Sequence, residues 1–128
     1  MRTLYYIQAE KAGMSYLKTS LKGEYEIISL KDPKECFQSI QYLKDHHQQF
    51  PEVIIMDYPM SDMSGLHMVE SLYEMLPDTH LILLLPEDNE ELLFEIIKLG
   101  IMDYILKDKG YTRALSSLIA GKRLQVSI

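Results

Sequence analysis

Two residues of opposite charge, Asp57 and Lys107, each stand at the end of a run of residues typical of a β-strand. Asp57 closes residues 53–57, and Lys107 follows residues 103–106. If both runs lie in one parallel sheet, their carboxyl ends meet at the edge where ligands of such sheets bind. A carboxylate beside an ammonium group can act as a nucleophile, because the positive charge offsets the negative charge of an anionic reactant. The alternative is a structural pair, in which Asp57 caps the following loop and Lys107 forms an ion pair with it.

The elements that would position these two residues follow a repeating pattern. Short apolar runs rich in β-branched or aromatic residues alternate with stretches in which apolar residues recur every three or four positions. The predicted strands are residues 3–8, 25–30, 53–57, 81–85 and 103–106. The third and fourth runs are apolar without alternation, as expected of central strands with helices on both faces. The sequence therefore predicts an α/β fold with a doubly wound, five-stranded parallel sheet.

Each predicted helix carries an apolar stripe that should face this sheet. The stripe residues are Met14, Leu17, Leu21, Cys36, Ile40, Leu43, Val69, Leu72, Leu76, Leu92, Leu93, Ile96, Ile97, Leu99, Leu115, Leu118 and Ile119. Cys36 is accordingly predicted to be a core residue of the second helix. It is also the lone cysteine, so the chain can form no internal disulfide, which fits a reducing compartment.

The composition is that of an ordinary globular protein, with 47% hydrophobic and 25% charged residues. A length of 128 residues predicts a single domain over residues 1–128, and the last helix could continue into a linker of a longer protein. The net charge of −6, without a dense Lys/Arg stripe, argues against direct nucleic-acid binding. No apolar run approaches the ~20 residues of a membrane helix, so we expect a cytoplasmic protein without membrane contact.

Two segments resemble response regulator receiver domains of two-component signalling. Residues 57–65, Asp-Tyr-Pro-Met-Ser-Asp-Met-Ser-Gly, are similar to the loop that begins with the family's phosphoacceptor aspartate. Residues 99–107, Leu-Gly-Ile-Met-Asp-Tyr-Ile-Leu-Lys, are similar to the end of its fourth helix and its fifth strand. The resemblance covers nearly the whole chain, and it implies the flavodoxin-like receiver fold with strand order 2-1-3-4-5. It also implies that Asp57 accepts a phosphoryl group and that Lys107 contacts the phosphoryl oxygens.

The metal site implied by the resemblance is incomplete in this sequence. In the family, an acidic pair after the first strand holds Mg²⁺ together with the phosphoacceptor, but Gln8 and Ala9 stand at these positions. Glu10 follows one residue late and could take part only if a bulge shifts the strand register. With Asp57 and the backbone carbonyl of Pro59 as the remaining ligands, Mg²⁺ should bind only weakly, because it prefers one or two carboxylates plus waters.

The switch residues implied by the resemblance are Leu85 and Tyr104. Leu85 stands where the family has a Ser or Thr that hydrogen-bonds the phosphoryl group, and it has no hydroxyl. Tyr104 matches the family's switch aromatic, although a half-buried strand tyrosine is an equally simple interpretation. Signalling through a hydroxyl and an aromatic ring should therefore be impaired.

The fourth predicted helix has more apolar residues than one sheet face can cover. Leu93, Phe94 and Ile97, together with Tyr104, should form a partly exposed surface. In receiver domains the fourth helix, fifth strand and fifth helix contact dimer partners and downstream proteins, so the resemblance implies a homodimer through this face.

We keep two hypotheses and consider neither an enzyme. The first is a receiver-like module of a phosphorelay, in which Asp57 accepts a phosphoryl group from a histidine kinase or a phosphotransfer protein. The second is a degenerate receiver that docks or dimerises independently of phosphorylation. A nucleotide-binding or flavodoxin-like enzyme is disfavoured, because residues 8–11 contain no glycine-rich phosphate loop.

Overall fold

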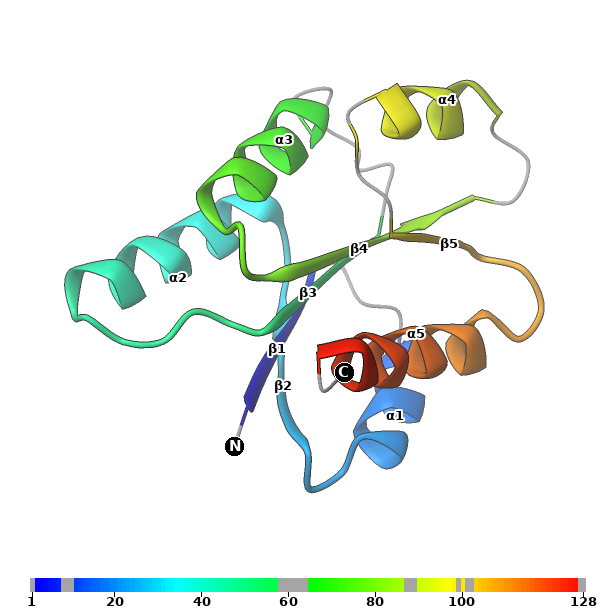
Figure 1. Cartoon of the computed structure of the whole chain (residues 1–128), viewed down its shortest axis with the longest axis horizontal. Helices are drawn as coiled ribbons and strands as arrows, with labels where there is room; N and C mark the ends of the chain where they lie inside the picture. Colours follow the sequence, from blue (N-terminus) through cyan, green and yellow to red (C-terminus); the bar gives the residue numbers. More distant parts are fainter. Residues whose placement is uncertain are drawn as a thin grey trace.

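The computed structural model describes most of the chain, and five parallel strands can be followed through it. It describes residues 2–7, 11–57, 65–86, 90–98, 100 and 103–126. In this part of the chain, the strands are β1 (Arg2–Ile7), β2 (Tyr25–Leu30), β3 (Val53–Asp57), β4 (His80–Leu85) and β5 (Tyr104–Leu106). They form one sheet in the order β2-β1-β3-β4-β5, and all neighbours are parallel (Figure 1). The predicted fold class and strand order are confirmed.

Three strand boundaries differ from the prediction. The first strand begins at Arg2 and ends at Ile7, and the predicted last residue Gln8 lies outside the described residues. β4 begins at His80, one residue early, because the N–H of His80 donates to the carbonyl of Glu52 at 2.9 Å. β5 begins at Tyr104, one residue later than predicted. The first residue of a strand depends on hydrogen bonds to neighbouring strands. The apolar pattern of a single segment does not predict these bonds.

Helices cover both faces of the sheet. Those of the described residues are α1 (Lys11–Ser20), α2 (Pro33–Asp45), α3 (Gly65–Met75), α4 (Glu90–Lys98) and α5 (Tyr111–Val126). α1 and α5 lie on one face, while α2, α3 and α4 lie on the other (Figure 1). None of the helices that the structure describes is both long enough and apolar enough to cross a membrane.

The stripe residues that the structure describes pack against the sheet in two clusters, except Ile97, which is exposed. The predicted stripe residues Leu92 and Leu99 lie outside the described side chains. On the face of α1 and α5, Leu17, Leu115 and Ile119 are at most 2% exposed. On the other face, Ile40 and Leu72 are each 1% exposed. The strands β3 and β4 between these clusters are buried at every position, which confirms that they are the central strands. Burial of each such large apolar side chain stabilises the fold by roughly 1.5–3 kcal/mol.

α2 begins with a cap that can be read from the sequence. The side chain of Asp32 accepts a hydrogen bond from the N–H of Glu35 at 2.9 Å, and Pro33 occupies the first turn. Both features satisfy or remove backbone N–H groups that a helix start leaves without partners. The cap sets the start of the helix that directs Cys36 into the core, where it is fully buried as predicted.

Burial raises the pKa of the Cys36 thiol from 9.0 to about 12. Between these values the unfolded chain releases a proton that the folded chain retains, so the stabilisation is complete below pH 9 and is lost as the pH rises. We expect this group to lower the free energy of unfolding by about 1 kcal/mol between pH 8 and pH 10. The measurement is urea unfolding of the wild type and of Cys36→Ala at both pH values. The cavity in the variant has the same cost at each pH, so parallel pH dependences in the two proteins would contradict the prediction.

Candidate functional site

Asp57 and Lys107 meet at the carboxyl edge of the sheet, as predicted. Asp57 is the last residue of β3, and Lys107 directly follows β5. β4 lies between these strands, and the N–H of Lys107 donates to the carbonyl of Leu85 at its end, at 2.8 Å. From there the Lys107 Nζ donates to the Asp57 Oδ1 at 2.7 Å. The ammonium group therefore reaches the carboxylate across the end of the central strand.

This ion pair is largely shielded from water. The side chain of Asp57 is 12% exposed and that of Lys107 is 22% exposed. A carboxylate with so little access to solvent loses hydration, and a nearby positive charge compensates for part of that loss. The short contact with charge on both groups belongs to the stronger class of hydrogen bonds. The carboxylate oxygen is thus held in a site where an incoming anion meets a fixed positive charge.

β4, which lies between β3 and β5, ends in an apolar residue. Leu85 is 1% exposed and lies in the cluster beneath α2, α3 and α4. Tyr104 packs against the same cluster and is half-buried, as the simpler interpretation of this residue predicted. The Leu85 side chain offers no hydrogen bond to a ligand, whereas the Lys107 ammonium beside Asp57 can donate one to an anion.

The other predicted metal ligands follow the ends of β1 and β3 in the sequence. Gln8, Ala9, Glu10 and Pro59 lie outside the described residues. Within the part that the structure describes, no group of three His, Cys, Asp or Glu side chains could hold a metal ion. The described residues supply one carboxylate, that of Asp57, and a single carboxylate is a poor site for Mg²⁺.

The apolar surface predicted on α4 is present. Phe94 is 65% exposed and Ile97 is 56% exposed, whereas Ile96 is fully buried and Leu93 is partly buried. The Lys98 Nζ lies 5.5 Å from the centroid of the Phe94 ring. Three acidic residues of α4 lie beside Phe94, namely Glu90, Glu91 and Glu95. α4 therefore presents an apolar centre with a charged border, as contact surfaces commonly do.

A contact between a histidine and a carboxylate could not be predicted from the sequence. His80 is buried at the start of β4, and its Nε2 contacts the Asp103 carboxylate. Asp103 immediately precedes β5, the neighbour of β4 in the sheet. The two residues are 23 positions apart, and only the pairing of β4 with β5 brings them together.

The chain is similar to known signalling proteins. The response regulator receiver domain family matches residues 6–118. The oxygen regulatory protein NreC of Staphylococcus epidermidis is 41% identical over 99 residues, covering 77% of this chain and 43% of that protein. The transcriptional regulatory protein YxjL of Bacillus subtilis, described as uncharacterized, is 39% identical over 76 residues, covering 59% of this chain and 35% of that protein. The chain thus spans less than half the length of these relatives.

Solved structures share the fold. A response regulator from Thermotoga maritima superposes with a TM-score of 0.73 at 20% identity, covering 94% of this chain and 96% of that one. A receiver domain protein from Methanospirillum hungatei also has a TM-score of 0.73 at 20% identity, covering 95% and 93% of the two chains. At this level of identity the comparison supports the fold alone.

The burial of the ion pair predicts an asymmetry between two variants. Lys107→Met removes the ammonium and leaves the Asp57 carboxylate in its shielded position, so we expect destabilisation by about 1–3 kcal/mol. The double variant Asp57→Asn/Lys107→Met removes both charges, and we expect it to recover at least half of that loss. Urea unfolding at pH 7 measures both, with Lys109→Met as the control at an exposed lysine two residues away. A double variant less stable than Lys107→Met would show that the pair is not governed by desolvation.

Proposed function

Because this chain belongs to the response regulator receiver family, we propose that Asp57 accepts a phosphoryl group from a histidine kinase or a phosphotransfer protein. The chain is then the receiver domain of a two-component response regulator and not itself an enzyme. The single observation that carries the proposal is the Lys107 Nζ, 2.7 Å from the Asp57 Oδ1 at the carboxyl edge of the sheet. This edge is where open parallel sheets bind ligands.

The proposed transfer uses the two charges in turn. A carboxylate oxygen of Asp57 bonds to phosphorus, while the bond from phosphorus to the donor histidine nitrogen breaks and the electron pair stays with the imidazole. Negative charge spreads over the three equatorial phosphoryl oxygens during this step. The Lys107 ammonium, already beside the carboxylate, can contact those oxygens once the new bond has formed. Its charge then stabilises both the transition state and the acyl phosphate.

Magnesium would add positive charge at the same place. Asp57, the backbone carbonyl of Pro59 and Glu10 are the residues of this chain proposed to hold it. Gln8 and Ala9 stand where the family has its acidic pair, so we propose weak metal binding and slow phosphoryl transfer. The lack of a hydroxyl on Leu85 removes another contact to the phosphoryl oxygens.

If Asp57 is the acceptor, mass spectrometry of the intact protein should detect a phosphorylated form. After incubation with acetyl phosphate and Mg²⁺, we expect a fraction of the wild type to gain one phosphoryl group by intact mass. Asp57→Asn should gain none, and Lys107→Met should gain at least tenfold less, because the transition state loses its ammonium. Asp108→Asn is a matched control at an exposed carboxylate and should behave as the wild type. If the same fraction of Asp57→Asn as of the wild type gained a phosphoryl group, the acceptor would be another residue.

A second candidate function is docking that does not depend on phosphorylation. It is favoured by the exposure of Phe94 and Ile97 on α4, and by an ion pair that already neutralises Asp57 without any ligand. In this proposal the α4 surface, with Leu93 and Tyr104 at its buried border, contacts a second copy of the chain. The site at Asp57 then contributes to the stability of the sheet edge.

The docking proposal predicts self-association that depends on α4. In sedimentation velocity of the unphosphorylated protein, we expect a dimer that weakens at least tenfold in Phe94→Asp and persists in Asp57→Asn. Tyr42→Asp is the control, since Tyr42 is also an exposed aromatic residue but lies on α2. A wild type that stays monomeric, or equal weakening by both aspartate substitutions, would contradict docking through α4.

A further inference from the structure

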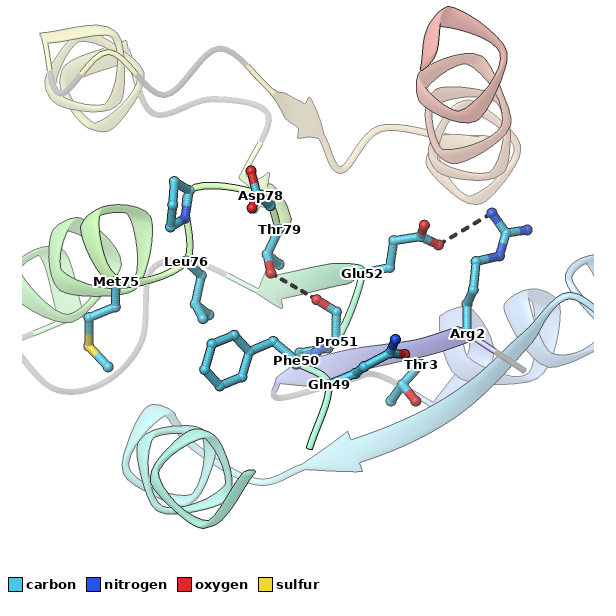
Figure 2. A pocket seen from close by; sticks show the side chains of 11 residues that line it. Arg2, Thr3, Gln49, Phe50, Pro51, Glu52, Met75, Leu76, Asp78 and Thr79 are labelled. Atoms are coloured by element: carbon cyan, nitrogen blue, oxygen red, sulfur yellow. Dashed lines mark hydrogen bonds and ion pairs between the residues drawn. The ribbon is translucent and has the colours of Figure 1, made fainter. Parts of the chain in front are cut away.

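A cleft of ≈ 630 Å³ opens at the amino edge of the sheet, where β1, β3 and β4 begin (Figure 2). Its lining comes from the start of β1, the segment before β3, and the turn between α3 and β4. Asp57 lies at the other end of β3, four residues beyond Val53, which is roughly 13 Å at the rise of a strand. The cleft is thus separate from the phosphoacceptor site, and its volume lies within the range of ligand-binding pockets.

The floor of the cleft is held by hydrogen bonds between the strand starts. The Thr79 hydroxyl donates to the carbonyl of Pro51 at 2.8 Å (Figure 2). The N–H of Glu52 donates to the carbonyl of Thr3 at 2.9 Å, and the N–H of His80 donates to the carbonyl of Glu52 at 2.9 Å. These bonds fix the three segments against one another. The backbone of the cleft is therefore already ordered, and a ligand does not have to bear the entropy cost of ordering it.

One side of the cleft is apolar and exposed. Phe50 is 41% exposed and Met75 is 44% exposed, and Figure 2 shows both side chains beside Leu76, which is buried. Large apolar side chains in such positions remain in contact with water that a ligand could displace. An aliphatic or aromatic side chain entering between them would bury apolar area from both residues.

The polar side of the cleft favours a positive group. Arg2 and Glu52 form an ion pair at 3.3 Å, so the charge of the arginine is balanced within the cleft (Figure 2). Asp78 is an exposed carboxylate at the rim that forms no ion pair with any described residue. The chain also carries a net charge of −6, which attracts cationic segments over a longer range.

From this arrangement we propose that the cleft binds a segment of a protein partner in which an apolar side chain is followed by Lys or Arg. The apolar side chain packs against Phe50, Met75 and Leu76, and the cation pairs with Asp78. The hydrogen-bonded starts of β1, β3 and β4 determine the shape of the cleft. The carboxylate of Asp78 gives it a preference for a basic segment. A segment bound here does not cover Asp57 or Lys107, because the two sites lie at opposite edges of the sheet.

A capped dipeptide tests the proposal directly. In ¹H–¹⁵N spectra of the full chain, acetyl-Phe-Lys-amide should shift the amide signals of Phe50, Glu52, Leu76 and Thr79. Acetyl-Phe-Glu-amide, with the opposite charge, should bind at least fivefold more weakly. Asp57→Asn should bind the lysine peptide as the wild type does, which separates this result from any failure of phosphoryl transfer.

Matched charge reversals on and beside α3 provide the control. Asp78→Lys should weaken the lysine peptide at least fivefold and abolish the preference over the glutamate peptide. Glu70→Lys reverses an exposed charge on α3 that does not line the cleft, and it should weaken both peptides by less than twofold. Equal binding of the two peptides to the wild type, or shifts confined to other residues, would overturn the proposal. Shifts of the same amides on raising protein concentration without peptide would assign the cleft to a second copy, and would also overturn it.

Discussion

The contact between the Lys107 ammonium and the Asp57 carboxylate depends on the register of three neighbouring strands. Asp57 is paired with Leu84, and the N–H of Lys107 donates to the carbonyl of Leu85, so both side chains start from the same level of the sheet. A slip of one residue in β3 would turn the carboxylate to the opposite face of the sheet. The buried side chains of β3 and β4 prevent such a slip, because it would also exchange the apolar residues of both faces. The core therefore maintains the geometry of the site.

The ion pair between Asp57 and Lys107 is compatible with both proposed functions. The low exposure of both side chains strengthens the attraction between the charges but raises the cost of their dehydration. A phosphoryl group arriving at Asp57 brings further negative charge, and Lys107 is the described cation that can meet it. Without a phosphoryl group, the charges of Asp57 and Lys107 compensate each other at the carboxyl edge of the sheet. The exposed apolar residues of α4 are available to a partner in either case.

The two edges of the sheet have different chemistry. The carboxyl edge places an ammonium group beside a carboxylate, which suits an anionic ligand. The amino edge has an internal Arg2–Glu52 pair, exposed apolar side chains and the carboxylate of Asp78, which suit a cationic segment with an apolar anchor. Both edges are built on β3, whose five residues are all buried. The buried strand β3 thus separates the Asp57–Lys107 pair from the cleft around Phe50.

The residue types and their spacing within single segments were enough to predict the five strands, the burial of Cys36 and the exposure on α4. The position of Asp57 and Lys107 at a common edge followed from the strand ends and the parallel topology. These features could be predicted because the faces of a helix or strand are determined by neighbouring residues in the same segment. The first residues of β4 and β5, the His80–Asp103 pair and the cleft around Phe50 could not. Each requires segments far apart in the sequence to lie at a particular register, and only the packed sheet decides that register.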